Sequence, residues 1–385
     1  GLGNASVYSA YGNTSLGRES LFSISSGDSN VAVGNSALYA LTTGQYNVVI
    51  GNNAGEDMVG AGYNVVVGRQ AAKSITAGTY NVFIGQQAAY SHAGQISNTI
   101  FIGNNAGQGY VNTGIDDTYN VAVGNFSMGY IATGNWNTAL GHSSLQGVTD
   151  AGDGQAKDSV ALGAYTLRYV SGTAANYNTA VGHRAMQGAS TGITGYSNTA
   201  VGRDALGSIT SGYTNVAIGN LAGYTLTTGY YNVYLGSTAG SGATSSAHSN
   251  VGIGISALSS NHGAGNVGIG RGALSSTLDA NQVAIGYSSL EANTTGEKNT
   301  AVGYFTLTAN NNTAMGHNTL LSNIGGSGNT AIGFESMKAF DEAADTRNTA
   351  IGAYSMTTLE TGSSNTAVGY YAMGAAKAAT NNDYN

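Results

Sequence analysis

The chain has no cysteine and no proline among its 385 residues, and only 8% of its residues are charged. An average globular domain is about 25% charged. The absence of cysteine excludes a disulfide framework and a thiolate metal site. The net charge is −7 without a basic cluster, which argues against nucleic acid as a partner. No apolar run approaches the roughly 18 residues of a membrane span, so we expect no membrane insertion.

Glycine is abundant instead, with 60 residues, and it marks a repeat. The strings NTAVGYYAM (365–373), NTAVGHRAM (178–186) and NVAVGNSAL (30–38) are nearly the same. When the copies are aligned on this glycine, here called the corner glycine, 20 of them fill the chain, and degenerate copies at Gly3 and Gly17 make about 22. The usual interval is 17 residues. A repeat of this kind along a whole chain predicts a solenoid.

We therefore expect one repeat solenoid over residues 1–385. Residues 1–29 would form degenerate first coils, residues 30–373 the regular coils and residues 374–385 a C-terminal tail. A helical solenoid is disfavoured because Asn-Thr-Ala-Val-Gly combines β-branched residues with a glycine in every copy. The fold class predicted is all-β, a parallel β-solenoid of about 22 coils.

Each copy reads as a short strand with two faces. A Val, Thr or Ile and the aliphatic residue before the corner glycine alternate with a central residue that is usually Ala. We expect the aliphatic pair to point into the coil and the central residue to point outward, onto a closely packed face between chains. The bulkier Val49, Val66, Phe83, Phe101 and Tyr234 share this register. The predicted interface residues are Ala122, Ala180, Ala217, Ala284, Ala301, Ala314, Ala331, Ala350 and Ala367.

Asn opens the strand in 17 of the 20 copies, for example at Asn30, Asn47 and Asn365. In stacked coils these side chains would form a ladder about 4.8 Å apart, in which each amide bonds its neighbours or caps a turn. We interpret them as structural.

The motif NTAVGxxAL, together with NVAIGNLAG (215–223), closely resembles the head repeat of trimeric autotransporter adhesins, which also occurs in phage tail fibres. This resemblance implies a left-handed parallel β-roll and a homotrimer. The family unit is nearer 14 or 15 residues, whereas 17 is usual here. No heptad stalk or membrane anchor follows residue 369, which favours a phage tail fibre over an adhesin head.

Aromatic residues precede the strand Asn in several consecutive copies. In a parallel roll they would form exposed ladders, and exposed rings can stack on sugars or merely shield backbone. A looser set, Tyr287, Tyr304 and Tyr370, follows the corner glycine. The predicted glycan-contact residues are Tyr46, Tyr63, Tyr80, Tyr119 and Trp136.

Other chemistry has weaker support in the sequence. Asp150, Asp153 and Asp158 lie in a long interval and form a weak calcium candidate, although their spacing does not match a helix-loop-helix site. No Ser-His-Asp set has a meaningful spacing. We expect no enzyme, no cofactor and no resident metal.

Function is therefore expected to be non-enzymatic and extracellular, on a virion tail fibre or a bacterial cell surface. The leading hypothesis is a trimeric attachment fibre of the phage tail-fibre type, with a host surface glycan as a possible partner. The alternatives are a bacterial trimeric autotransporter adhesin head and a purely structural shaft that binds no ligand.

Overall fold

The computed structural model describes residues 10–91, 95–109, 117–131, 134–148, 156–171, 175–260, 262–276, 278–291, 296–306, 310–323, 325–340 and 346–374. Its contacts divide the chain into two units. The first comprises residues 1–201 with 209–211, and the second comprises residues 202–208 with 212–385.

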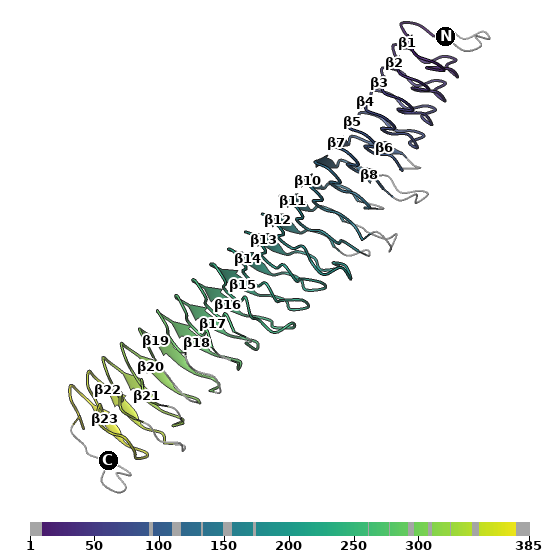
Figure 1. The fold of residues 1–385 in the computed structure, drawn as a ribbon. Helices are drawn as coiled ribbons and strands as arrows, with labels where there is room; N and C mark the ends of the chain where they lie inside the picture. The colour runs from purple at the N-terminus through teal and green to yellow at the C-terminus, as the bar shows by residue number, and fades with distance from the viewer. Residues whose placement is uncertain are drawn as a thin grey trace. The chain divides into compact units, whose positions relative to one another are not determined.

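Both units are built from strands of two or three residues joined by turns, and the described residues contain no helix (Figure 1). The strands of the first unit are β1 (Thr14–Leu16), β2 (Val31–Val33), β3 (Val48–Ile50), β4 (Val65–Val67), β5 (Val82–Ile84), β6 (Ile96–Ser97), β7 (Ile100–Ile102), β8 (Asp117–Thr118), β9 (Val121–Val123), β10 (Thr138–Leu140), β11 (Val160–Leu162), β12 (Thr179–Val181) and β13 (Thr199–Val201). The strands of the second unit are β14 (Val216–Ile218), β15 (Val233–Leu235), β16 (Val251–Ile253), β17 (Val267–Ile269), β18 (Val283–Ile285), β19 (Thr300–Val302), β20 (Thr313–Met315), β21 (Thr330–Ile332), β22 (Thr349–Ile351) and β23 (Thr366–Val368).

The main sheet has 21 strands, and within each unit successive strands pair in parallel and in register. Of the strands in the described residues, only β6 and β8 lie outside it, in a small sheet of their own. Equivalent repeat positions therefore stack directly above one another, as Val31, Val48 and Val65 do. This arrangement confirms the predicted parallel β-solenoid. The degenerate copy at Gly17 forms strand β1, and the copy at Gly3 lies outside the described residues.

The predicted orientation of the strands is wrong. In every strand of the main sheet after β1 the central residue is buried, and the two flanking residues are exposed or half-buried. The interface candidates are consequently core residues, because 0% of the surface of Ala122, Ala180, Ala217, Ala284, Ala301, Ala314, Ala331 and Ala350 is exposed, and 4% of that of Ala367.

Crowding inside the coil explains why the central residue is small. The third and fourth residues after the corner glycine also point inward, as Ala37 and Leu38 do, and both are fully buried. Little room remains opposite the strand, so Ala32 fits where a second large side chain would not. Where the central strand residue is large, the fourth residue after the corner glycine is small. Phe101 and Gly107 are an example, because a Cβ on Gly107 would lie 2.1 Å from the ring of Phe101.

The Asn ladder predicted from the sequence is present. The Asn30 Oδ1 accepts hydrogen bonds from the Asn47 backbone N–H at 3.0 Å and the Asn47 Nδ2 at 2.9 Å. The same Asn47 Nδ2 donates to the carbonyl oxygen of Ala61 at 2.8 Å. The Asn47 amide thus both bonds its neighbour and caps a turn, and it satisfies polar backbone that the core would otherwise leave unpaired.

The corner glycines are required by the stacking of the coils. Gly34 has a φ of 136°, and a Cβ there would lie 2.3 Å from the carbonyl oxygen of Gly51 in the next coil. The same contact recurs from coil to coil, for example between Gly219 and Gly236 at 2.3 Å. A side chain at this position would push neighbouring coils apart.

Candidate functional site

Two of the predicted aromatic ladders exist as stacked rings on the surface of the first unit. The ring centroids of Tyr46 and Tyr63 are 5.0 Å apart, and those of Tyr63 and Tyr80 are also 5.0 Å apart. Tyr119 and Trp136 stack at 4.2 Å with an interplanar angle of 9°. All five side chains are exposed. Each residue has a positive φ, near 60°, at the turn that leads into its strand.

Stacking limits what these rings can bind. Tyr63 lies between two other rings, so neither of its faces is open to a sugar. Only the ring edges, the hydroxyl groups and the outer faces at the ends of each ladder remain accessible. The ladders are therefore better suited to edge contacts and hydrogen bonds than to the face-on stacking that a single exposed ring offers.

A longer ladder in the second unit was only partly anticipated. Tyr287, Tyr304, His317 and Phe334 each follow a corner glycine, and they stack in turn with centroid separations of 5.3, 4.9 and 5.3 Å. Tyr370 does not join this stack, and instead contacts Tyr354 and Tyr371. His317 and Phe334 were missed because the expectation concerned tyrosine alone, although their repeat position was already identifiable.

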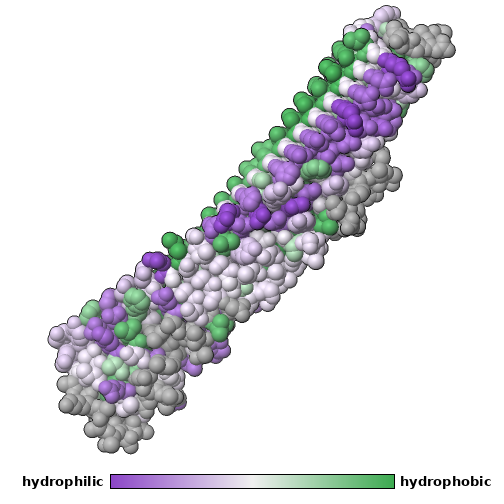
Figure 2. Space-filling view, in the orientation of Figure 1, coloured by the Kyte–Doolittle hydropathy of each residue, from purple (hydrophilic) through white to green (hydrophobic). Residues whose placement is uncertain are grey.

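The outward face of the strands carries an uncharged aliphatic surface, here called the strand face. It consists of the first and third residues of each strand of the main sheet, which are mainly Val, Ile, Leu, Met and Thr. In the first unit Val48 is 37% exposed and Ile50 is 41% exposed. Figure 2 shows a line of hydrophobic side chains along the strands of this unit, beside a line of hydrophilic ones. The exposed members of the second unit include Ile218, Ile285, Met315, Ile351 and Val368.

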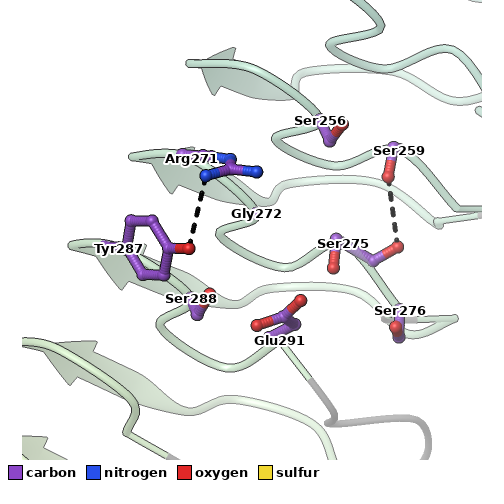
Figure 3. A pocket seen from close by; sticks show the side chains of 9 residues that line it. All are labelled: Ser256, Ser259, Arg271, Gly272, Ser275, Ser276, Tyr287, Ser288 and Glu291. Carbon is purple, nitrogen blue, oxygen red and sulfur yellow. Dashed lines mark hydrogen bonds between the residues drawn. The ribbon is translucent and has the colours of Figure 1, made fainter.

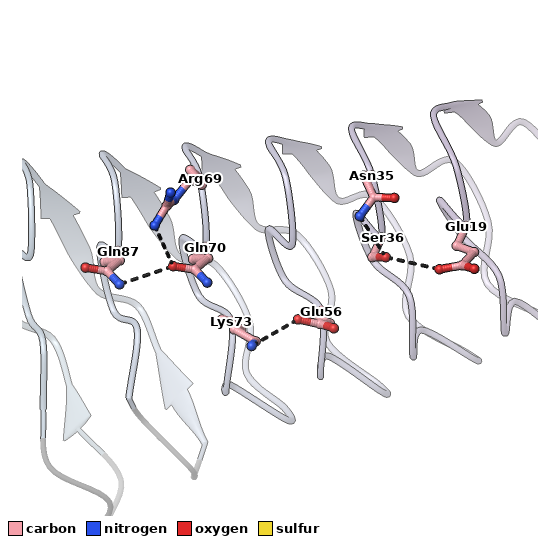
Figure 4. A network of polar contacts seen from close by, with 8 residues as sticks. All are labelled: Glu19, Asn35, Ser36, Glu56, Arg69, Gln70, Lys73 and Gln87. Atoms are coloured by element: carbon pink, nitrogen blue, oxygen red, sulfur yellow. Dashed lines mark hydrogen bonds and ion pairs between the residues drawn. The ribbon is translucent and has the colours of Figure 1, made fainter.

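The hydrophilic surface of the first unit includes the first, second and fifth residues after corner glycines such as Gly51 and Gly68. In the early coils their side chains fill it with polar contacts (Figure 4). Lys73 Nζ lies 3.4 Å from Glu56 Oε2, and Gln87 Nε2 donates to Gln70 Oε1 at 3.1 Å. These positions stack in register, so the residue types of neighbouring coils determine whether the surface is filled or hollow.

In the second unit the same positions form a groove of about 390 Å³, here called the corner groove (Figure 3). Its lining is polar and comprises Ser256, Ser259, Arg271, Gly272, Ser275, Ser276, Tyr287, Ser288 and Glu291. A second groove of about 390 Å³ lies at equivalent positions in the first unit, between His142, Gln146 and Arg168. Sequence reasoning missed both grooves. Alignment of the repeat would have gathered their residues, because they occupy the same few positions in three successive coils.

The calcium candidate is only partly described. Asp150 and Asp153 lie outside the described residues, whereas Asp158 is exposed and occupies the turn before β11. Among the described residues no group of three or more His, Cys, Asp or Glu side chains is arranged to hold a metal ion.

The described residues also contain no helix that is long and apolar enough to cross a membrane. No protein-family model, curated protein or solved structure matches this chain.

Proposed function

We propose that this chain is a non-enzymatic segment of a trimeric attachment fibre, of the phage tail-fibre type, that acts outside the cell and contacts a host surface glycan. The observation that carries the proposal is the strand face. Its aliphatic side chains, such as Ile50 and Ile218, recur from coil to coil without charge. Contiguous exposed apolar surface of this kind normally marks an interaction site.

A second and a third copy of the same chain are the proposed partners of the strand face. A flat aliphatic surface with no charge pattern offers little to select a different partner, but it is complementary to itself. The number three follows from the resemblance to the adhesin and tail-fibre repeat. The trimer interface thus moves from the buried Ala residues to the flanking aliphatic residues.

Glycan contact is assigned to the surfaces that the proposed trimer leaves open. The chain is too sparsely charged to capture a polyanion by electrostatics, so neutral hydrogen bonding and aromatic edges would carry recognition. Single sites of this kind are weak. Similar sites on three chains would gain avidity, about 10²- to 10⁴-fold.

The experiment replaces Tyr46, Tyr63 and Tyr80 together by Ser and measures adhesion to host cells and to immobilised glycans. The expected result is lower adhesion by a protein that is still trimeric in light scattering. Loss of the trimer would place the ladder at the subunit interface instead, since each Tyr lies two residues before its strand.

A purely structural shaft is the second candidate, and ring stacking favours it. Tyr63 and its neighbours cover one another's faces, as they would if their role were to shield the turns. Unchanged adhesion after the triple substitution would support the shaft. A bacterial adhesin head would share the strand face and the ladders, and it remains the alternative for the origin of the chain.

A further inference from the structure

In the corner groove of the second unit, one coil lacks a side chain. Gly272 is the second residue after its corner glycine, and the coils on either side carry Ser256 and Ser288 at that position. A Cβ on Gly272 would lie 3.5 Å from Ser288 Oγ and 3.7 Å from Glu291 Oε1, which is ordinary contact distance. In one early coil of the first unit the same repeat position holds Gln70, whose side chain contributes to the polar network in Figure 4. A long side chain at Gly272 would therefore occupy the groove.

Arg271 supplies a positioned cation at one side of this groove. Its guanidinium lies over the ring of Tyr287 at 5.5 Å, and its Nη1 donates to the Tyr287 hydroxyl at 3.4 Å (Figure 3). No ion pair links Arg271 to a carboxylate within the part of the chain that the structure describes. The remaining donors of the guanidinium are thus available to an anion, and a planar guanidinium pairs well with a carboxylate.

The rest of the lining is made of groups that pair with hydroxyls. Serine hydroxyls both donate and accept, and the Glu291 carboxylate accepts from hydroxyl donors. Glu291 also opposes the entry of a ligand with many negative charges. A volume of about 390 Å³ falls within the range of about 300–1,000 Å³ seen for small-molecule sites.

We propose that the corner groove binds a monosaccharide unit that carries one carboxylate beside free hydroxyls, such as a terminal uronic or sialic acid. The carboxylate pairs with Arg271, and the hydroxyls bond Glu291 and the serines. This inference rests on the proposed attachment function and names the class of sugar that it would recognise.

The equivalent groove in the first unit is a poorer site for such a sugar. Its Arg168 Nε already donates to Gln146 Oε1 at 3.0 Å, and the guanidinium lies over Tyr169 at 4.5 Å and Tyr165 at 5.2 Å. Fewer of its donors are free, and its lining is aromatic where the groove of the second unit has serines.

The test uses the full chain on an array of uronic-acid- and sialic-acid-terminated oligosaccharides, each printed beside its neutral counterpart. The Gly272→Gln variant fills the groove with a residue that the chain itself uses at this repeat position. The matched control is Asn318→Gln, also the second residue after a corner glycine, where the φ of 54° is similar to the 68° of Gly272. A second variant, Arg271→Gln, removes the charge and leaves the groove open.

The expected result is binding of the carboxylated glycans by the unmodified chain and by the control. Gly272→Gln and Arg271→Gln should both weaken this binding, Arg271→Gln by about 10- to 100-fold, as expected for loss of a charged hydrogen bond. Carboxylated-glycan binding that is unchanged in both variants would overturn the groove but leave the attachment function standing. Preference for the neutral counterparts would overturn the assigned sugar class. No binding to any glycan, together with no adhesion to host cells, would overturn both proposals.

Discussion

A large side chain at the centre of a strand is matched by a small residue four places after the corner glycine. Phe101 is paired with Gly107 and Tyr234 with Gly240, whereas Ala331 is paired with Met337. A Cβ on Gly240 would lie 2.5 Å from the Tyr234 ring. In these coils a large and a small side chain therefore share the interior, as close packing requires.

This matching predicts compensation between two substitutions. Ala331→Phe alone should overpack the coil and cost about 1–3 kcal/mol of unfolding free energy. Met337→Gly alone should cost about 2–5 kcal/mol through the cavity it leaves. Because Met337 has a φ of 52°, glycine is well tolerated by the backbone there.

The double variant Ala331→Phe with Met337→Gly should be more stable than the sum of the single effects allows. Urea unfolding of the four proteins measures the coupling. Strictly additive costs would show that the two side chains do not share one volume.

A buried histidine gives the second unit a dependence on pH. The His262 Nε2 lies 2.9 Å from the Tyr234 hydroxyl, and its Nδ1 donates to the carbonyl oxygen of Ser260 at 2.8 Å. Burial lowers the pKa of His262 from 6.5 to about 4, although its hydrogen bonds to backbone carbonyls oppose the shift. The unfolded chain therefore binds this proton more readily than the folded chain does. The contribution of neutral, buried His262 to the free energy of unfolding is complete above about pH 6.5 and declines as the pH falls towards 4.

His262→Gln should remove this dependence. Between pH 7.5 and 4.5 the unmodified chain should lose about 2–3 kcal/mol more unfolding free energy than the variant. The titration of carboxylates contributes equally to the loss in both proteins, so it cancels in the comparison. Equal losses, measured by urea unfolding at the two pH values, would mean that His262 is accessible to protons in the folded chain.

Among the elements of the fold, the Asn ladder sets the register of each coil on the next. Where Asn is replaced, the substitutes preserve part of its bonding: the Ser159 Oγ accepts from the Asn178 backbone N–H at 3.2 Å, and Gln282 accepts from the Asn299 Nδ2 at 3.2 Å. This position therefore requires a side chain that accepts a hydrogen bond from the following coil, and residues other than Asn can supply it.

Asn47→Ala should be markedly more destabilising than Asn47→Ser. Alanine leaves the Asn64 backbone N–H and Nδ2 without their acceptor, and the Ala61 carbonyl without its donor. The expected cost of Asn47→Ala is about 2–4 kcal/mol, since buried unpaired groups each cost roughly 1–3. Thermal unfolding of both variants provides the measurement, and equal midpoints would argue that water replaces the lost bonds.

The repeat, its short strands and the Asn ladder could be predicted because they depend on spacing and on local bonding. Alternation could not predict which face of each strand points into the core, since a period of two defines two faces without saying which one is inside. Aliphatic Val and Ile suggested the core, yet Leu38 and its counterparts already fill it. The pairing of a large residue, Phe101, with Gly107 in the same coil is the sequence feature that indicates an inward-pointing central residue. No motif marks Gly272, whose missing side chain lies in the corner groove.

At the scale of the whole molecule, the proposed trimer depends on whether other copies of the chain cover the strand face. Ile218 and Ile285 point outward from β14 and β18 and are 43% and 39% exposed, so Arg at these positions should leave each coil folded. In the proposed trimer the same substitutions place charges in a dry interface, at a cost of roughly 3 kcal/mol or more per site. The neighbouring core residue Ala217 responds differently, because Arg there disrupts the coil itself.

We therefore expect Ile218→Arg with Ile285→Arg to give a folded monomer, and we expect the unmodified chain to be a trimer at micromolar concentration. Light scattering measures the mass, and circular dichroism checks that the β structure persists. Ser246→Arg is the control, since it adds one such charge at an exposed turn of the same unit and should remain trimeric. Ala217→Arg should lose the β signal as well as the trimer. A monomeric unmodified chain, or a double Arg variant that stays trimeric, would show that copies of this chain do not associate through the strand face. The interface would then have to be sought on a surface that these two residues do not touch.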